Sequence, residues 1–153
     1  MIDTDVFYSF FDTKDKYHLD SVAMLTHCIE GRCGQPFTTD YINLEVATLL
    51  QKRLASEVAA AFIDFLYQSK ISTFVIEGED YESTVRLFRK HFKRLSFCDA
   101  STITAMDALN ISNLATYDKR SFTGLVGLIY GDKDFESLSD SDKTEIRKLL
   151  KRH

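Results

Sequence analysis

Hydrophobic residues along this chain follow two patterns, which predict two kinds of secondary structure. Short, dense apolar runs are typical of buried strands, whereas apolar residues three or four positions apart predict amphipathic helices. The short runs predict strands at residues 1–8, 72–77, 111–116 and 125–130. The helical spacing predicts helices at residues 17–30, 39–50, 58–67, 79–94, 99–110 and 139–152.

Two stretches of the sequence allow more detailed predictions. Residues 58–67 are apolar on most sides of the predicted helix, so we expect this helix to be buried. Pro36 and Phe37 lie between two predicted helices and are interpreted as a turn. Gly31 and Gly34 mark the end of the first predicted helix, because glycine readily adopts the conformation that follows a helix C-terminus.

The alternation of strands and helices predicts an α/β fold, organised as one domain over residues 1–153. Parallel neighbouring strands need long crossover connections, usually helices, so this pattern favours a mostly parallel sheet with flanking helices. Ligands of such sheets bind outside the carboxyl ends of the strands. We expect Asp3, Asp99 and Asp118 to lie there.

The balance of charged residues limits the functions that the chain can have. It carries 19 basic and 23 acidic residues, a formal net charge of -4, which argues against nucleic-acid binding through overall charge. Any RNA binding must therefore be local or assisted by a metal. The sequence also lacks a Walker loop, a Gly-x-Gly-x-x-Gly fingerprint and a Gly-x-Ser-x-Gly elbow, which argues against the usual nucleotidase, dinucleotide-binding and serine-hydrolase classes.

Cysteine content and hydropathy predict a soluble, cytoplasmic protein. Cys28, Cys33 and Cys98 are odd in number and follow no signal peptide, so they are interpreted as reduced thiols. No apolar run approaches the roughly 20 residues of a membrane-spanning helix.

Four acidic residues follow or interrupt apolar stretches, where a charge is costly: Asp3, Glu45, Asp99 and Asp118. A shared divalent cation would explain them, because hard cations prefer oxygen ligands and offset the repulsion between carboxylates. Each acid alone also has a structural interpretation, as a helix cap, a turn former or a partly exposed helix residue. The four together favour a metal site.

The surroundings of these acids resemble four motifs of the PIN-domain family, and within it the VapC-like ribonuclease toxins. An apolar strand followed by acidic and small polar residues stands at 2–6, and a polar turn leading into a helix with one inward Glu stands at 39–46. The third and fourth motifs lie at 95–101 and at 114–119 with Phe122. The resemblance covers residues 2 to 122, whereas the predicted strand and helix at about 125–152 match none of the motifs.

This resemblance implies a fold, a cofactor and a reaction. The fold would be a three-layer α/β/α arrangement with a central, mostly parallel sheet. Mg²⁺ or Mn²⁺ would be held by catalytic, metal-binding acids, namely Asp3, Glu45, Asp99 and Asp118, with Asp5 as a helper. The reaction would be hydrolysis of RNA phosphodiester bonds, leaving a 5′-phosphate and a 3′-hydroxyl.

Polar and basic residues near the acids are candidates for substrate binding. Thr4 and Thr116 would either bind the scissile phosphate or hold a carboxylate in place. Lys119 and Arg120 lie beside the predicted metal site and could position the RNA without reading its bases. The basic residues at 86–94 are either a further RNA contact or a solvated helix face.

The family also implies a homodimer and, for the toxins, an antitoxin that covers the first helices. Leu25, Ile29, Leu49 and Leu50 would contribute to such a surface, unless they pack in the core. The leading hypothesis is therefore the ribonuclease toxin of a type II toxin–antitoxin pair. A housekeeping RNA-processing or decay nuclease, and a catalytically inactive RNA- or partner-binding module, are the alternatives.

Overall fold

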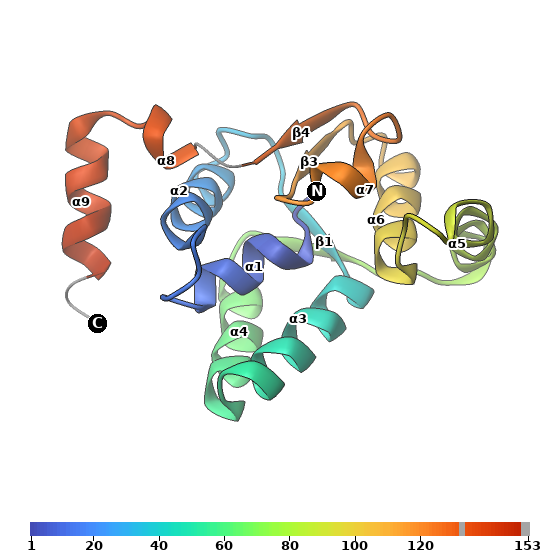
Figure 1. Cartoon of the computed structure of the whole chain (residues 1–153), viewed down its shortest axis with the longest axis horizontal. Coiled ribbons are helices and arrows are strands. Elements are labelled where there is room, and N and C mark those ends of the chain that lie inside the picture. Colours follow the sequence, from blue (N-terminus) through green and yellow to red (C-terminus); the bar gives the residue numbers. More distant parts are fainter. Residues whose placement is uncertain (132–133, 151–153) are drawn as a thin grey trace.

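Helices surround a small group of central strands in the computed structural model, which describes residues 1–131 and 134–150 (Figure 1). The longer helices are α1 (Thr4–Phe11), α2 (His18–Ile29), α3 (Asp40–Arg53), α4 (Ser56–Gln68), α5 (Gly78–His91), α6 (Phe97–Ala108) and α9 (Asp140–Leu150). The short helices are α7 (Lys119–Phe122) and α8 (Asp134–Ser137). The strands are β1 (Phe37–Thr39), β2 (Ser72–Phe74), β3 (Asn113–Ala115) and β4 (Leu128–Tyr130).

The N-terminal residues 1–3 join two pairs of parallel strands. β1 pairs with β2, and β3 pairs with β4. On one side, the backbone N–H of Ile2 donates to the carbonyl of Phe37 in β1 at 2.8 Å. On the other, Ile2 bridges Ala115 of β3 in parallel, and the N–H of Asp3 donates to the carbonyl of Ala115 at 3.0 Å. The spatial order is therefore β2, β1, residues 1–3, β3 and β4.

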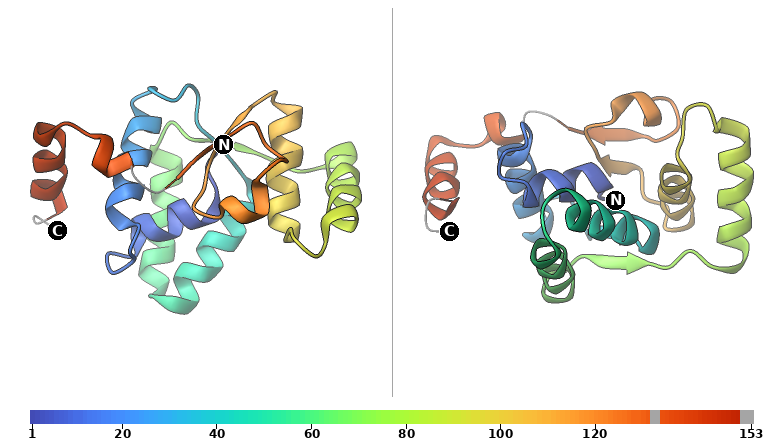
Figure 2. Two further views of the ribbon diagram at one scale, coloured as in Figure 1. Left: turned by 45° about the horizontal axis from the view of Figure 1, so that its top comes forward. Right: turned by 60° about the horizontal axis from the view of Figure 1, so that its bottom comes forward.

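Side chains of the central strands alternate between two hydrophobic cores, as the pleat of a strand requires. Ile2 and Ala115 belong to a core shared with α1, α2, α3 and α4, whereas Met1 and Leu114 belong to one shared mainly with α6 and α7. The views in Figures 1 and 2 accordingly place α1, α2 and α4 on one side of the strands and α5 and α6 on the other. This arrangement is the α/β architecture with flanking helices that the sequence predicts.

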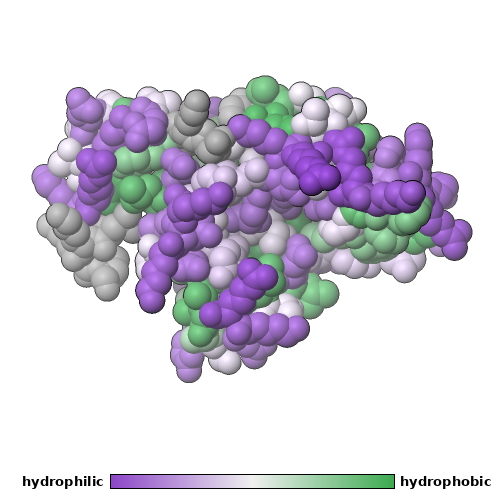
Figure 3. All heavy atoms as spheres, in the orientation of Figure 1, coloured by the Kyte–Doolittle hydropathy of each residue, from purple (hydrophilic) through white to green (hydrophobic). Residues whose placement is uncertain are grey.

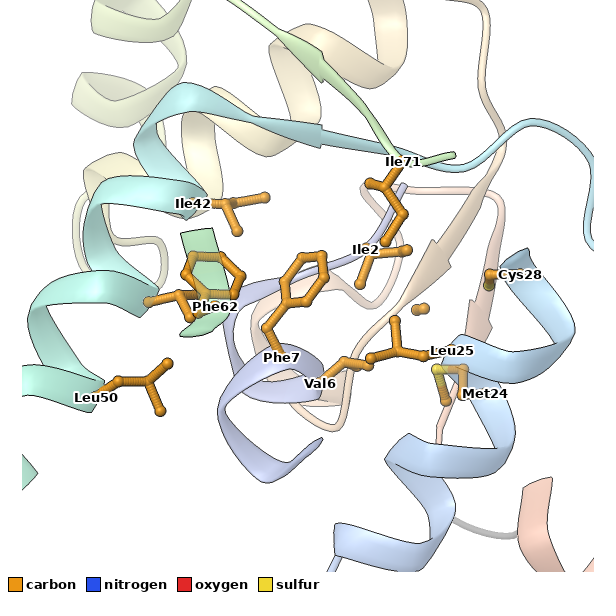
Figure 4. Packing of buried hydrophobic residues seen from close by; sticks show 12 residues of the cluster. Ile2, Val6, Phe7, Met24, Leu25, Cys28, Ile42, Leu50, Phe62 and Ile71 are labelled. Atoms are coloured by element: carbon orange, nitrogen blue, oxygen red, sulfur yellow. The ribbon is translucent and has the colours of Figure 1, made fainter. Parts of the chain in front are cut away.

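The first core is built around a contact between α1 and α4. Phe7 and Phe62 are both fully buried, and their rings meet edge to face with centroids 5.4 Å apart (Figure 4). Leu25 of α2 and Leu50 of α3 are also buried in this core. These two leucines therefore pack in the core and do not form part of an exposed partner surface.

The predicted strand at residues 1–8 is wrong beyond Asp3, because the chain turns into α1 at Thr4. The Asp3 side chain accepts a hydrogen bond from the Thr4 N–H at 2.9 Å and caps the helix. A short apolar run fits a buried strand and a buried helix equally well. Here the Asp3 carboxylate caps a helix, so the run after it forms α1 and not a strand.

Other expectations also need correction. Phe37, interpreted as part of a turn, begins strand β1, and β2 ends at Phe74, before the predicted Glu77. Helix α4 is not buried on most sides: Phe62 is its fully buried residue, while Tyr67 is 87% exposed. Other apolar residues of α4, such as Ile63 and Tyr67, therefore lie on the surface of the chain.

The C-terminal elements extend the structure beyond the predicted motifs. Strand β4 adds to the sheet beside β3, and Phe135 of α8 packs with Ala23 of α2 and Ile146 of α9. The helix predicted at 139–152 is found as α9, and its last two predicted residues lie outside the described residues.

Two further features concern the helices and the cysteines. Over residues 1–131 and 134–150, no helix combines the length and the apolar character that crossing a membrane requires. Within the same residues, Cys28, Cys33 and Cys98 form no disulfide bond.

Phe62→Ala should lower the free energy of unfolding by about 3–5 kcal/mol, because it removes a fully buried ring and leaves a cavity. Tyr67→Ala on the same helix should change it by no more than about 0.5 kcal/mol, because that ring is exposed. Urea unfolding followed by circular dichroism at low protein concentration measures both. Equal losses for the two variants would contradict the orientation of α4.

Candidate active site

The candidate site lies where the order of strands reverses its direction. From residues 1–3 the chain moves to β1 and β2 on one side, and it later returns to β3 and β4 on the other. The segments that leave the two central strands diverge at such a point and open a crevice at their carboxyl ends. Asp3 ends the first of these strands, and Thr116, Tyr117 and Asp118 follow the second.

Asp3 is a buried carboxylate held by two hydrogen bonds. Its Oδ1 accepts from the Thr4 N–H at 2.9 Å, and its Oδ2 accepts from the Thr116 hydroxyl at 2.8 Å. Burial raises the pKa of Asp3 well above its usual value, and the nearby charge of Asp5 raises it further. The two hydrogen bonds act in the opposite direction but do not reverse this shift.

Asp5 joins the first turn of α1 to the segment after β3. Its Oδ2 accepts from the Tyr117 N–H at 2.9 Å, the Asp118 N–H at 3.0 Å and the Thr116 hydroxyl at 3.1 Å. Within the described structure its Oδ1 is buried without a hydrogen-bond partner. Burial raises the pKa of Asp5 to about 6, against the lowering effect of these hydrogen bonds.

The Thr116 hydroxyl lies between the carboxylates of Asp3 and Asp5. It has one proton, so it can donate fully to only one of the two at a time. The same hydroxyl accepts a hydrogen bond from the Asp118 N–H at 3.1 Å. Of the two predicted roles of Thr116, the structure therefore contains the second, in which it holds carboxylates in place.

Glu45 reaches the site from α3 and is held by Thr4. Its Oε2 accepts from the Thr4 hydroxyl at 2.6 Å, and this hydroxyl also lies 3.9 Å from the Cys98 sulfur. Burial, followed by the negative charges of Glu45 and Asp3, raises the pKa of the Cys98 thiol. The thiol therefore stays neutral, and Thr4, like Thr116, positions a carboxylate.

Asp99 and Asp118 stand at the starts of two helices. Asp99 accepts from the Ser96 N–H at 2.7 Å and completes a capping box at the start of α6. Asp118 caps α7, with its Oδ2 accepting from the Ser121 hydroxyl at 2.6 Å. Burial raises the pKa of Asp99, and the charges of Asp118 and Glu45 add to the effect.

These electrostatic couplings show that the predicted acids lie together. Asp3 is affected by Asp5 and Asp99, and Asp99 by Asp118 and Glu45. The structure thus brings acids that are far apart in the sequence into one region beside the ends of the central strands, and their roles as metal ligands and catalytic residues stay a prediction. Among the described residues, the carboxylate of Asp5, expected only as a helper, accepts three hydrogen bonds, more than any other carboxylate of the cluster.

The carboxylate cluster, made of these five acids, fits a hard divalent cation by its chemistry. It offers oxygen ligands, and it brings like charges together, from the buried Asp3 to the exposed Asp118, where a cation would stabilise them. Among the described residues, however, no three Asp, Glu, His or Cys side chains are arranged as a formed metal site. At Asp118, both carboxylate oxygens accept hydrogen bonds from Ser121. A bound ion would compete with these donors.

Some contributors to the site were not predicted from the sequence. Ser121 and Ser96 hold Asp118 and Asp99, and Cys98 lies behind Glu45. A signal for the first two exists, since Asp118 and Ser121, like Ser96 and Asp99, have the three-residue spacing of helix caps. Lys119 and Arg120 were predicted as substrate contacts, and both are exposed at the start of α7.

In a metal-free buffer, Asp5→Asn should flatten the dependence of stability on pH. A carboxyl with a folded pKa of about 6 and an unfolded value near 3.9 stabilises the fold below pH 4, and this contribution is lost as the pH rises through 6. The loss is roughly 2 to 3 kcal/mol at pH 8. Asparagine keeps an oxygen for the two backbone N–H groups and carries no charge.

The measurement is the free energy of unfolding at pH 4 and pH 8, with chelator present. The free energy of unfolding of Asp5→Asn minus that of the wild type should be larger at pH 8 than at pH 4. For the exposed Asp64→Asn, this difference should be the same at both pH values. A difference for Asp5→Asn that is independent of pH would contradict the prediction.

Comparison with known proteins tests the family that the motifs suggest. No protein-family model matches the chain. A VapC ribonuclease of Archaeoglobus fulgidus is 30% identical over 155 residues, covering 99% of this chain and 94% of the relative. Among solved structures, Mycobacterium tuberculosis VapC20, described as a sarcin-ricin loop cleaving toxin, aligns with a TM-score of 0.71.

The VapC20 alignment covers 80% of this chain and 92% of the other at 18% identity, so it bears on the fold alone. It confirms the predicted PIN-like α/β fold. The A. fulgidus relative matches over nearly the full length of both proteins. The resemblance drawn from the four motifs is thereby confirmed, and this chain belongs to the VapC ribonuclease family.

Proposed function

We propose that this protein is a divalent-metal-dependent endoribonuclease that hydrolyses RNA phosphodiester bonds as the toxin of a toxin–antitoxin pair. The observation that carries the proposal is the carboxylate cluster at the carboxyl ends of the central strands, in a chain of the VapC ribonuclease family. A purely structural set of caps would not need acids placed so that neighbouring charges raise the pKa of Asp3 and Asp99. Strongly perturbed carboxylates in a crevice are typical of catalytic sites.

The cluster would hold Mg²⁺ or Mn²⁺. A bound cation would supply a polarised water for attack and would stabilise negative charge on the phosphate. Without a cation the cluster would repel a nearby phosphate, since the charges of Asp118 and Glu45 lie close enough to Asp99 to raise its pKa. A bound cation would offset this repulsion at the bond to be cut.

The chain's own residues would fix the ligands and manage the protons. Thr4 holds Glu45, and Thr116 holds Asp3 and Asp5. These hydrogen bonds limit the rotation of the carboxylates, as partners of metal ligands commonly do. Burial and the charge of Asp5 raise the pKa of Asp3, and a bound cation would oppose this effect by favouring the ionised carboxylate.

Partner binding would use an apolar face on α3 and α4. Leu44 is 66% exposed and Tyr67 is 87% exposed, and such large apolar side chains on neighbouring helices are typical of interfaces. We propose this face for a second copy of the chain or for an antitoxin protein.

A nuclease of cellular RNA would act in the cytoplasm, where thiols such as that of Cys98 remain reduced.

The wild-type protein, freed of any antitoxin, should cleave RNA in the presence of Mn²⁺ or Mg²⁺ and lose this activity with chelator. Asp99→Asn should reduce the cleavage rate by at least about 100-fold, because it removes a proposed metal ligand. Mutation of a residue that only hydrogen-bonds a metal ligand commonly lowers metal affinity or activity by 10- to 100-fold. Asparagine keeps an acceptor for Ser96. The control is Asp107→Asn on the same helix, an exposed residue, which should retain full activity.

Rates are measured by gel electrophoresis of labelled RNAs, including structured ribosomal RNA fragments. A wild-type protein that binds these RNAs but cuts none of them with either ion would favour the inactive binding module. Growth arrest on expression, relieved by Asp99→Asn, would favour a toxin over a housekeeping nuclease.

Metal binding itself should be visible in stability. A ligand present at about 100 times its dissociation constant stabilises the folded state by about 2.7 kcal/mol, so saturating Mn²⁺ should raise the melting temperature of the wild type. Asp99→Asn should lose most of this increase, and Asp107→Asn should keep it. The same increase in all three proteins would place the ion elsewhere.

A further inference from the structure

A groove lined by basic side chains begins beside Asp118. Its volume is about 660 Å³, and its lining residues are Lys93, Arg94, Asp118, Arg120 and Ser121. Asp118 belongs to the carboxylate cluster, so the groove continues directly from the candidate active site. Figure 3 shows strongly hydrophilic surface over this part of the molecule, from α7 toward α5.

Arg94 is already engaged with the protein backbone. Its Nε donates to the carbonyl of Arg120 at 3.1 Å, and its Nη2 donates to the carbonyl of Thr123. Both carbonyls belong to α7 and its C-cap, and Asp118 caps the other end of this short helix. The Arg94 guanidinium therefore fixes the helix that carries Asp118.

Lys93 and Arg120 differ from Arg94 in this respect. Both side chains are exposed, and across the described residues neither has a carboxylate partner. The Lys93 ammonium lies 5.9 Å from the centroid of the Phe92 ring, a weak contact. Two cations are thus available to a ligand, and the acid in the groove, Asp118, already accepts hydrogen bonds from Ser121.

The charge of the whole chain makes this groove distinctive. With a net charge of -4, the protein has no general attraction for a polyanion, so local cations must provide it. A second hollow of about 450 Å³ between α5 and α6 has two basic residues in its lining, Arg86 and Lys90, and two acidic ones, Asp80 and Asp107. The groove beside Asp118 has three basic residues and one acid in its lining, so it is the more basic of the two.

We propose that this groove binds the RNA backbone on one side of the bond to be cut. Lys93 and Arg120 contact phosphates, and Arg94 is a positioning residue that acts through α7 and Asp118. Phosphate contacts of this kind set the register of the strand and carry no information about sequence. The proposal rests on the proposed function, because it assigns the substrate path of the same site.

The test measures RNA binding separately from cleavage. A fluorescein-labelled single-stranded RNA is titrated with Asp99→Asn protein, which leaves the RNA uncut, and anisotropy is followed between about 50 and 200 mM salt. Each lost phosphate contact lowers the slope of log affinity against log salt by about 0.7 for single strands. Adding Lys93→Gln and Arg120→Gln together should weaken binding and lower the slope by about 1.4.

The matched control is Lys52→Gln in the same background, an exposed lysine in the last turn of α3. It should change neither the affinity nor the slope. If the double variant binds with the affinity and slope of Asp99→Asn alone, the groove does not bind the backbone. This result is independent of catalysis, so it differs from failure of the proposed function, in which the wild type cuts no RNA.

A charge-conserving variant of Arg94 in the active protein tests its positioning role. The exposed control Lys52→Gln should retain the KM and kcat of the wild type. Arg94→Lys should lower kcat at least about 10-fold while leaving the salt slope unchanged, because one ammonium cannot reproduce the guanidinium fork. An Arg94→Lys protein with normal kcat, or with a slope reduced as in the double variant, would overturn the positioning role.

Discussion

The Asp5 carboxylate is the interaction on which the geometry of the site depends. It accepts both the Tyr117 and the Asp118 N–H groups and so attaches the N-terminal helix to the segment that leaves β3. This contact aligns Asp3, at the end of one strand, with Asp118, beyond the end of its neighbour. It is made at an energetic cost, because burial raises the pKa of Asp5 to about 6 and the Asp3 carboxylate lies close by. An Asn in place of Asp5 could make the same backbone contacts without that cost, so the charge has a reason beyond holding the fold together.

How much of the fold could be predicted depended on the length of the elements. Helices α2, α3, α5 and α6 are long enough for their spacing to be clear, and the predicted positions hold to within a few residues. The strands are three residues long, too short for alternation to be read reliably, so β1 was interpreted as a turn. Met1 to Tyr8 was extended too far as a strand because the capping effect of Asp3 outweighed the β-like composition of Val6 and Phe7. The assignment of one domain to residues 1–153 remains a prediction.

The candidate site was more predictable from motifs than from physical patterns. Asp3, Glu45, Asp99 and Asp118 could be named because they stand in apolar surroundings and match the family's motifs in order. What the sequence could not show is how each oxygen is used. The hydroxyls of Thr4 and Thr116 meet their carboxylates only after folding, and the Thr116 contacts with Asp3 and Asp5 span more than 100 positions. The central position of Asp5 follows from such a contact.

The structure also explains how an acidic protein can be suited to an acidic substrate. Attraction to RNA cannot come from a net charge of -4, and at short range the carboxylate cluster opposes it. Two local sources of positive charge would be needed: a cation inside the cluster and basic side chains just outside it. The groove at Asp118 places Lys93 and Arg120 at that boundary, and Arg94 connects it mechanically to the helix that Asp118 caps. Binding of the backbone and placement of the carboxylate therefore depend on one short element, α7. Helix α7 has only four residues, and Phe122 is its main hydrophobic contact with the core. Its position therefore relies on the polar contacts at both of its ends. A single substitution can remove such a contact.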